Sequence, residues 1–141
     1  MDRYLFNLKD QFLNIDNIDN DPLIYSFNNT IPKANDQELL FGETILYPGS
    51  INGEYFMTKG HNHQVPCAEV YYGIEGEAIV LCENSEDSYE TKLVPGSVVY
   101  CKPGYAHRVI NKSDSICRFF CVCRADAGHD YNVKFSKRYF K

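Results

Sequence analysis

Short apolar runs, separated by polar turns that contain Pro, Gly or Asn, recur along most of the chain. Runs of this length and spacing predict β-strands. The predicted strands are residues 23–27, 38–47, 54–58, 69–74, 76–83, 89–94, 97–101, 106–111, 116–123 and 131–135. Many short strands with little helix are typical of an antiparallel sandwich or barrel. The sequence therefore predicts an all-β fold.

The first 20 residues follow a different pattern. Apolar residues stand close to helical spacing at Leu5, Leu8, Phe12 and Ile15, with Asn and Asp among them. This spacing predicts either a short amphipathic helix packed against the body or a loose arm. We therefore expect residues 1–20 to form an N-terminal arm and residues 21–141 to form a single β domain.

The composition is that of a globular protein, with 44% hydrophobic residues and a net charge of −5 at pH 7. The acidic balance and the lack of a run of Lys or Arg argue against nucleic acid or an anionic membrane as a partner. No apolar stretch reaches the roughly 20 residues that a membrane-spanning helix needs. The first residues also lack the basic and apolar regions of a signal peptide. These features predict a cytoplasmic protein.

Six cysteines are present, at positions 67, 82, 101, 117, 121 and 123. Without a secretory signal, reduced thiols are the simpler expectation. Cys117, Cys121 and Cys123 fall on one side of an apolar run, so we expect them to line one face of a strand as small apolar residues. They contain no CxxC pair, which disfavours a metal site built from these thiols.

The strongest chemical signal lies in residues 58–69. His61 and His63 are two residues apart, so in an extended strand their imidazoles point to the same side. Pro66 predicts that this strand ends before Glu69, which begins the next run. Two imidazoles and a carboxylate from neighbouring strands are typical of a divalent-metal site with open coordination positions.

His107 is the candidate for a fourth ligand. It follows the break at residues 103–104 and stands near the start of the predicted strand 106–111. The order of the hairpins allows this strand to approach His61, although the spacing alone does not place it there. With all four residues, a metal site is favoured over a His-x-His pair on an exposed strand face.

The same residues resemble the two motifs of the cupin superfamily. The matching positions are His61, His63, Glu69 and Gly76, followed by Gly96, Pro103, His107 and Asn111. In cupins these motifs lie on a double-stranded β-helix of jelly-roll type. The resemblance therefore implies a cupin barrel.

A narrower resemblance is to the cupin-type glucose-6-phosphate isomerases known from archaea. It rests on TKGHxH (58–63), AEVY (68–71), PGSVVY (95–100), AHR (106–108) and ADAGHDY (125–131). It covers roughly residues 44–131, and ADAGHDY is its most selective segment. The resemblance implies interconversion of glucose 6-phosphate and fructose 6-phosphate in glycolysis and gluconeogenesis. It also implies one iron, manganese or nickel ion per subunit, with zinc as a further option.

The resemblance also implies roles for single residues. The catalytic metal ligands would be His61, His63, Glu69 and His107. The positions matching sugar-phosphate contacts are Thr44, Thr58, Gly60, Tyr71, His129, Tyr131 and Tyr25. Glu69 is the candidate base for proton transfer, and a direct hydride shift without an enzymic base is the other mechanism. Edge strands and the habit of the family predict a homodimer.

Structural roles for the same residues stay open. Tyr71 can be an ordinary core aromatic, Thr44 and Thr58 can be plain β-formers, and His129 can cap a turn. Three other functions also stay open: another cupin sugar-phosphate isomerase, an iron-dependent dioxygenase, or a non-catalytic cupin that binds a sugar or a metal. The Thr and Tyr residues around the motif favour a polar substrate over the apolar pocket of an oxygenase. Lys59 and Arg124 are candidates for adding positive charge, although Lys59 in a strand should face away from Thr58.

Overall fold

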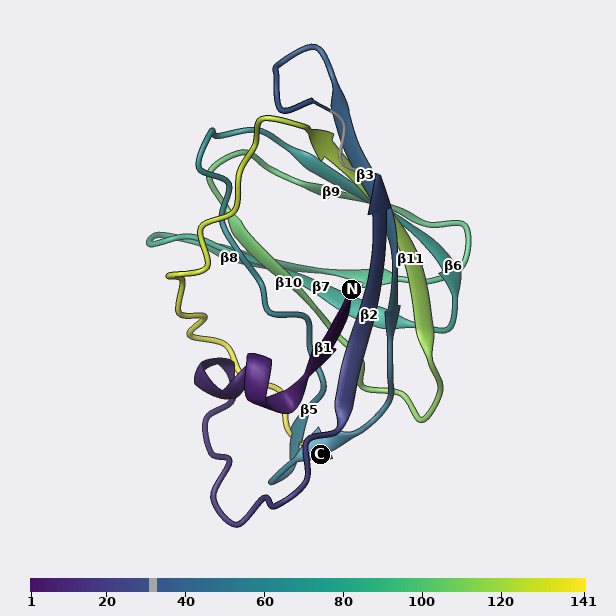
Figure 1. Cartoon of the computed structure of the whole chain (residues 1–141), viewed down its shortest axis with the longest axis vertical. Coiled ribbons are helices and arrows are strands. Elements are labelled where there is room, and N and C mark those ends of the chain that lie inside the picture. Colours follow the sequence, from purple (N-terminus) through teal and green to yellow (C-terminus); the bar gives the residue numbers. More distant parts are fainter. Residues whose placement is uncertain (31–32) are drawn as a thin grey trace.

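The computed structural model describes residues 1–30 and 33–141, and most of its regular structure is β (Figure 1). Its strands are β1 (Asp2–Tyr4), β2 (Leu23–Thr30), β3 (Leu39–Leu46), β4 (Ser50–Ile51), β5 (Glu54–Tyr55), β6 (Glu69–Glu75), β7 (Ala78–Glu83), β8 (Ser88–Leu93), β9 (Val98–Cys101), β10 (Ala106–Ile110) and β11 (Cys117–Arg124). Two short 3-10 helices, η1 (Leu5–Asn7) and η2 (Lys9–Gln11), follow β1. None of the helices in the described ranges is long and apolar enough to cross a membrane.

Two antiparallel sheets enclose the core. The larger has the order β1-β2-β3-β11-β6-β9 and the smaller the order β10-β7-β8, while β4 and β5 form a separate hairpin. In Figure 1 the strands β7, β8 and β10 lie across the barrel from β2, β3 and β11. Leu46 and Phe119 from one sheet and Val80 and Val109 from the other belong to the same buried cluster. The predicted all-β fold is confirmed.

The strand β11 shows how the sequence pattern sets this packing. Its residues alternate between buried and half-buried positions, and the buried ones are Cys117, Phe119, Cys121 and Cys123. All six thiols of the chain are free, and five of them are buried. The prediction that three cysteines line one strand face as apolar residues is confirmed.

The N-terminal residues pack against the same core. The strand β1 pairs with β2 and sets Arg3 opposite Tyr25. Leu5, Leu8 and Phe12 are buried in the common cluster. The apolar spacing in the sequence therefore indicated the positions that pack against the body of the protein, namely Leu5, Leu8 and Phe12. The sequence pattern did not predict β1, which is only three residues long.

The predicted amphipathic helix is replaced by η1 and η2. Side chains satisfy backbone donors here: the Tyr4 N–H donates to Asn7 Oδ1 at 2.9 Å, and the Phe6 N–H donates to Oδ1 of the more distant Asp21 at 2.7 Å. Asn and Asp side chains that bond to the backbone compete with the α-helical pattern. The segment therefore forms single turns.

Eight of the predicted strands correspond to β2, β3 and β6 to β11. The strand predicted at 131–135 is wrong, because Asp130 makes only an isolated bridge with Asn62 and no strand follows it. The strand predicted at 54–58 is shorter, since β5 covers only its first two residues. In both segments apolar side chains, such as Phe56 and Phe135, pack into the core although the backbone does not continue as a strand.

Candidate metal centre

Backbone pairing sets His61 beside His107. The His61 N–H donates to the His107 carbonyl at 3.2 Å, and the His107 N–H donates to the His61 carbonyl at 3.0 Å. Two extended residues that exchange both hydrogen bonds lie directly opposite each other, with their side chains on the same face. This bridge brings together two histidines whose proximity the sequence spacing did not establish.

The four candidate ligands meet at the carboxylate of Glu69, the first residue of β6. Its Oε2 lies 3.0 Å from Nε2 of His63, 2.9 Å from Nε2 of His107 and 3.6 Å from Nε2 of His61. One potential ligand atom from each of these residues lies within 4.8 Å of the others. The strand begins at Glu69, three residues after Pro66, as the sequence predicted.

Backbone carbonyls orient two of the imidazoles. Nδ1 of His63 lies 2.9 Å from the carbonyl oxygen of Cys67, and Nδ1 of His107 lies 3.1 Å from that of Tyr105. A carbonyl oxygen only accepts hydrogen bonds, so each Nδ1 carries a proton, and in a neutral ring each Nε2 presents a lone pair toward Glu69. In the third imidazole, that of His61, Nε2 is buried and has no hydrogen-bond partner in the described part of the chain.

Burial and mutual contact set the charges in this cluster. Burial lowers the pKa of His61 to about 4, against the opposing effect of Glu69, so this ring is neutral at pH 7. Burial alone would raise the pKa of Glu69, but the histidines, with His107 foremost, hold it well below its usual value. For His107 burial is likewise the largest single effect, yet Glu69 outweighs it and the pKa is raised.

These side chains fit a divalent cation. Neutral imidazole nitrogens and a carboxylate oxygen are all acceptors, and acceptors that converge in a buried place repel one another unless a proton or a metal ion lies between them. The contacts from Nδ1 to backbone carbonyls are the support that metal-binding histidines commonly have. The group of His61, His63, Glu69 and His107 could therefore hold one metal ion.

A cavity of about 160 Å³ opens beside this cluster, and His61, Glu69 and His107 form part of its wall. All of the residues predicted to contact a sugar phosphate line the same cavity, namely Thr44, Thr58, Gly60, Tyr71, His129, Tyr131 and Tyr25. His63, which is buried, is not part of the lining. The fold thus brings the predicted residues to one place, whereas their roles toward a ligand stay predictions.

A tight turn positions two of the aromatic lining residues. The rings of His129 and Tyr131 are stacked, with centroids 5.7 Å apart and planes 11° apart, and the His129 ring is 4.4 Å from that of His61. Gly128 precedes them with φ +65°, and a Cβ at this position would collide with the side chain of Gln64. The glycine therefore allows the turn that sets His129 against the metal cluster.

Two cations, Lys59 and Arg3, line the cavity, and no pattern in the sequence pointed to the second. Lys59 was expected to face away from Thr58, yet it lines the cavity and its Nζ lies 4.6 Å from the centroid of the Tyr131 ring. The expectation assumed a regular strand, whereas residues 58–60 lie outside the strands, so strict alternation does not apply to them. Arg3 also lines the cavity, from the short strand that no sequence pattern indicated.

Other lining residues that the sequence did not point to are Met1, Phe27, Asn29, Leu40, Phe119 and Cys121. Arg124, considered as a possible source of charge, instead forms two hydrogen bonds with Asp126, at 2.9 and 2.6 Å. It does not line the cavity.

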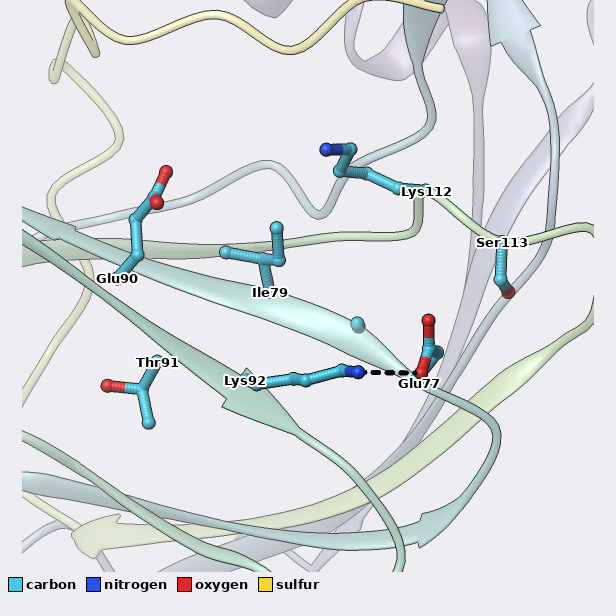
Figure 2. A pocket seen from close by; sticks show the side chains of 8 residues that line it. Glu77, Ile79, Glu90, Thr91, Lys92, Lys112 and Ser113 are labelled. Atoms are coloured by element: carbon cyan, nitrogen blue, oxygen red, sulfur yellow. Dashed lines mark ion pairs between the residues drawn. The ribbon is translucent and has the colours of Figure 1, made fainter.

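A larger hollow of about 530 Å³ lies along β7 and β8, away from the histidines (Figure 2). Lys92 Nζ lies 3.1 Å from Glu77 Oε2 there, with both side chains more than half exposed. None of the four candidate ligands lines this hollow. Its size alone does not mark a functional site, because its lining combines Lys92, Glu77 and other exposed groups and, among the described residues, holds no cluster of candidate ligands.

An all-β barrel with three imidazoles and a carboxylate converging beside an internal cavity is typical of a cupin. The family model of glucose-6-phosphate isomerase (GPI) matches residues 5–138, and the chain belongs to this family.

The similarity extends to individual relatives. The glucose-6-phosphate isomerase of Thermococcus kodakarensis is 38% identical over 135 residues, which are 92% of this chain and 71% of that protein. The enzyme of Thermococcus litoralis is 37% identical over 123 residues, which are 86% of this chain and 65% of that protein. This chain therefore spans only about two thirds of the length of these relatives.

Among solved structures, an oxalate oxidase in complex with the substrate analogue glycolate matches with a TM-score of 0.65 and 14% identity. The match covers 86% of this chain and 61% of that one. At this level of identity it bears on the fold alone, and it confirms the predicted cupin barrel.

Proposed function

We propose that this chain catalyses the metal-dependent interconversion of glucose 6-phosphate and fructose 6-phosphate. The observation that carries the proposal is the convergence of three imidazoles on Glu69 at the wall of a cavity that also contains hydroxyl, imidazole and cationic side chains. Membership of the GPI family and the names of the relatives support this choice of reaction. A phosphorylated sugar does not cross membranes freely, so a cytoplasmic location accompanies the proposal.

In this proposal His61, His63, Glu69 and His107 hold one divalent ion. Iron, manganese and nickel suit the donor set, and zinc is a further option. When bound, such an ion supplies stabilisation for the negative charge that develops on the C1 and C2 oxygens as the carbonyl moves between them.

Glu69 is the proposed acceptor of the C2 proton. Its Oε2 takes all three histidine contacts, which leaves Oε1 as the oxygen that accepts the proton and returns it to C1. The hydroxyl proton on the C2 oxygen passes to the C1 oxygen in the same conversion, which balances the reaction. The histidines outweigh burial and keep the pKa of Glu69 low, so the carboxylate is ionised at pH 7.

A hydride shift from C2 to C1 is the alternative, and an isotope distinguishes the two. With deuterium at C2 of glucose 6-phosphate, proton transfer through Glu69 releases part of the label to water. A hydride shift keeps all of the label on C1, and mass spectrometry of the product measures the difference.

The remaining cavity residues are proposed to bind the sugar phosphate. Thr58 Oγ1 accepts a hydrogen bond from the Val109 N–H at 3.0 Å, so its own hydroxyl proton is available to a ligand. Burial raises the pKa of Tyr25 and of Tyr71, so both phenols keep the proton that they would donate. The other proposed contacts are Thr44, Gly60, His129 and Tyr131.

We also propose that the protein is a homodimer joined through the outer face of the six-stranded sheet. A row of apolar side chains crosses neighbouring strands on this face. Val98 pairs with Tyr72, and Tyr72 pairs with Phe120. The ring of Phe120 lies 5.9 Å from the ring of Phe41. Val98 and Tyr100 are 67% and 54% exposed. A broad exposed apolar face is typical of an interface, and a second copy buries an identical face.

Light scattering after size-exclusion chromatography tests this arrangement. We expect a dimer for the unaltered chain and a monomer for Val98→Lys, whereas Lys92→Met on β8 leaves the dimer intact. A Val98→Lys protein that stays dimeric would place the interface elsewhere.

The enzymatic proposal is tested by loading the purified chain with manganese, iron or nickel and following the conversion of fructose 6-phosphate to glucose 6-phosphate. Turnover is expected with metal, and its loss is expected after addition of a chelator. Absence of turnover with every one of these metals, from a folded and metal-loaded protein, overturns the proposal. An oxygen electrode run in parallel detects oxygenase activity, which is not expected.

A further inference from the structure

We propose that Arg3 is the residue that makes the cavity selective for phosphorylated sugars, by binding the phosphate group. This inference rests on the proposed function and names the part of the site that recognises the anion. Arg3 lies in β1, outside the segments whose residues were matched to sugar-phosphate contacts. Its role is argued from its place in the fold, its burial and its lack of a charged partner.

The strand pairing turns Arg3 into the cavity. Arg3 is the register partner of Tyr25 in the antiparallel pair of β1 and β2, so the two side chains share one face of the sheet. Its neighbours in the strand, Asp2 and Tyr4, are exposed, whereas Arg3 is half-buried and lines the cavity. The alternation of a strand therefore sends the guanidinium inward.

The guanidinium has unused donor capacity in this position. Its Nε is fully buried and has no hydrogen-bond partner in the described part of the chain. The ion pairs found within residues 1–30 and 33–141 involve other cations, and none includes Arg3. A buried donor without a partner is costly, so its position points to a partner that arrives with the ligand.

The groups around Arg3 suit a phosphate. The guanidinium interacts with the phenol of Tyr25 and lowers its pKa, against the larger effect of burial, which raises it. Lys59 brings a second positive charge to the same cavity. Arg presents paired donors that match two phosphate oxygens, and hydrogen bonds between ionised groups are among the strong ones.

Arg3 also lies on a different part of the barrel from the metal cluster. Its strand β1 is separated from β6, which carries Glu69, by β2, β3 and β11 in the larger sheet. The two residues nevertheless line one cavity. A sugar phosphate has its reactive carbons at one end and its phosphate at the other, so it can meet both groups at once.

The test compares Arg3→Met with Lys92→Met, which removes the same charge from the outer hollow of Figure 2. For Arg3→Met we expect KM for fructose 6-phosphate to rise about 10- to 100-fold, with kcat changed less than about threefold. Arg3→Lys keeps the charge without the paired donors, so we expect an intermediate KM. Lys92→Met is expected to match the unaltered chain.

Inorganic phosphate gives a readout that does not depend on turnover. Calorimetry on the manganese-loaded protein is expected to show phosphate binding that weakens about 10- to 100-fold in Arg3→Met and is unchanged in Lys92→Met, at equal metal content. An Arg3→Met protein whose KM and phosphate affinity stay within twofold of the unaltered values overturns the inference. So does an equal loss in Lys92→Met.

Two further outcomes keep the inference separate from the proposed function and from folding. If the unaltered chain shows no turnover but binds phosphate through Arg3, the proposed isomerase activity fails and the anion site stands. If Arg3→Met does not fold, NMR of the Nε–H signal of Arg3 in the unaltered chain, assigned by its absence in Arg3→Lys, decides the matter. A saturable shift of this signal with phosphate supports the role of Arg3, and an unmoved signal overturns it.

Discussion

The metal cluster and the cationic residues of the cavity are built in different ways. At the metal cluster, backbone pairs and backbone carbonyls fix the side chains, and His63, Glu69 and His107 are only 6%, 4% and 2% exposed. Of the two cations that line the cavity, Arg3 comes from a three-residue strand and Lys59 from a segment outside the main sheets. The metal cluster therefore holds its ligand atoms in place before any ligand arrives, whereas Arg3 and Lys59 offer donors on longer side chains.

This difference separates chemistry from selectivity. A metal centre requires ligand atoms within a few tenths of an ångström of their positions, which strand pairing and carbonyl contacts provide. Recognition of a phosphate tolerates more variation, because several donors share a large anion. We therefore expect changes in the metal cluster to abolish the reaction and changes in the cationic residues to alter substrate affinity.

The largest effect is expected from His107→Ala. Loss of one imidazole ligand should strongly lower the fraction of protein that holds a metal ion, and it should lower kcat/KM at least about 100-fold. Loss of a contact that only supports a ligand already costs about 10- to 100-fold, and loss of the ligand itself should cost more. Mass spectrometry measures the metal content, and the isomerase assay measures kcat/KM. The control is His129→Ala, which alters a cavity residue that is not a candidate ligand and should keep its metal. A His107→Ala protein with full metal content and full activity contradicts the assignment of His107 as a ligand.

A smaller effect, on stability, is expected from Gly60→Ala. Gly60 has φ +73°, and an added Cβ would lie 2.7 Å from the Phe135 ring and 3.0 Å from the Arg108 side chain. Strain and crowding together should lower the free energy of unfolding by about 2–4 kcal/mol. Gly96→Ala is the matched control, since Gly96 has φ +83° but no atom near the added Cβ, and should cost about 1 kcal/mol. Denaturant unfolding of both variants measures the difference, and equal costs would show that Gly60 is needed only for its backbone conformation.

The smallest effect is expected from Thr44→Val. Thr44 is buried at the cavity wall, and removal of a neutral hydroxyl donor should raise KM for fructose 6-phosphate about 2- to 10-fold with kcat unchanged. Thr91→Val, in the outer hollow of Figure 2, removes the same group away from the cavity and should leave KM unchanged. An unaltered KM in Thr44→Val assigns this residue to the strand and not to the ligand.

The sequence predicted the parts of the site that depend on strand alternation and on motif spacing. The two-residue interval between His61 and His63 gave their common direction, and Pro66 gave the start of the strand at Glu69. The approach of His107 to His61 depends on a single backbone bridge between distant segments, so the resemblance to cupins supplied what the spacing did not.

The sequence failed where no periodic pattern exists. A strand as short as β1 cannot display alternation, and the inward direction of Arg3 therefore became visible only in the fold. Residues 131–135 show apolar spacing like that of a strand, but Phe135 packs as a single side chain in the core and its segment pairs with no neighbour. Lys59 lies outside the strands, so the alternation on which its expected direction depended does not apply there.

Anomalous diffraction from a crystal of the manganese-loaded protein tests the metal centre most directly. The account predicts a single strong manganese peak at about 2.0–2.3 Å from Nε2 of His61, His63 and His107 and from a carboxylate oxygen of Glu69. A manganese peak elsewhere in the chain, with the four side chains still in contact with one another and no ion among them, would contradict it.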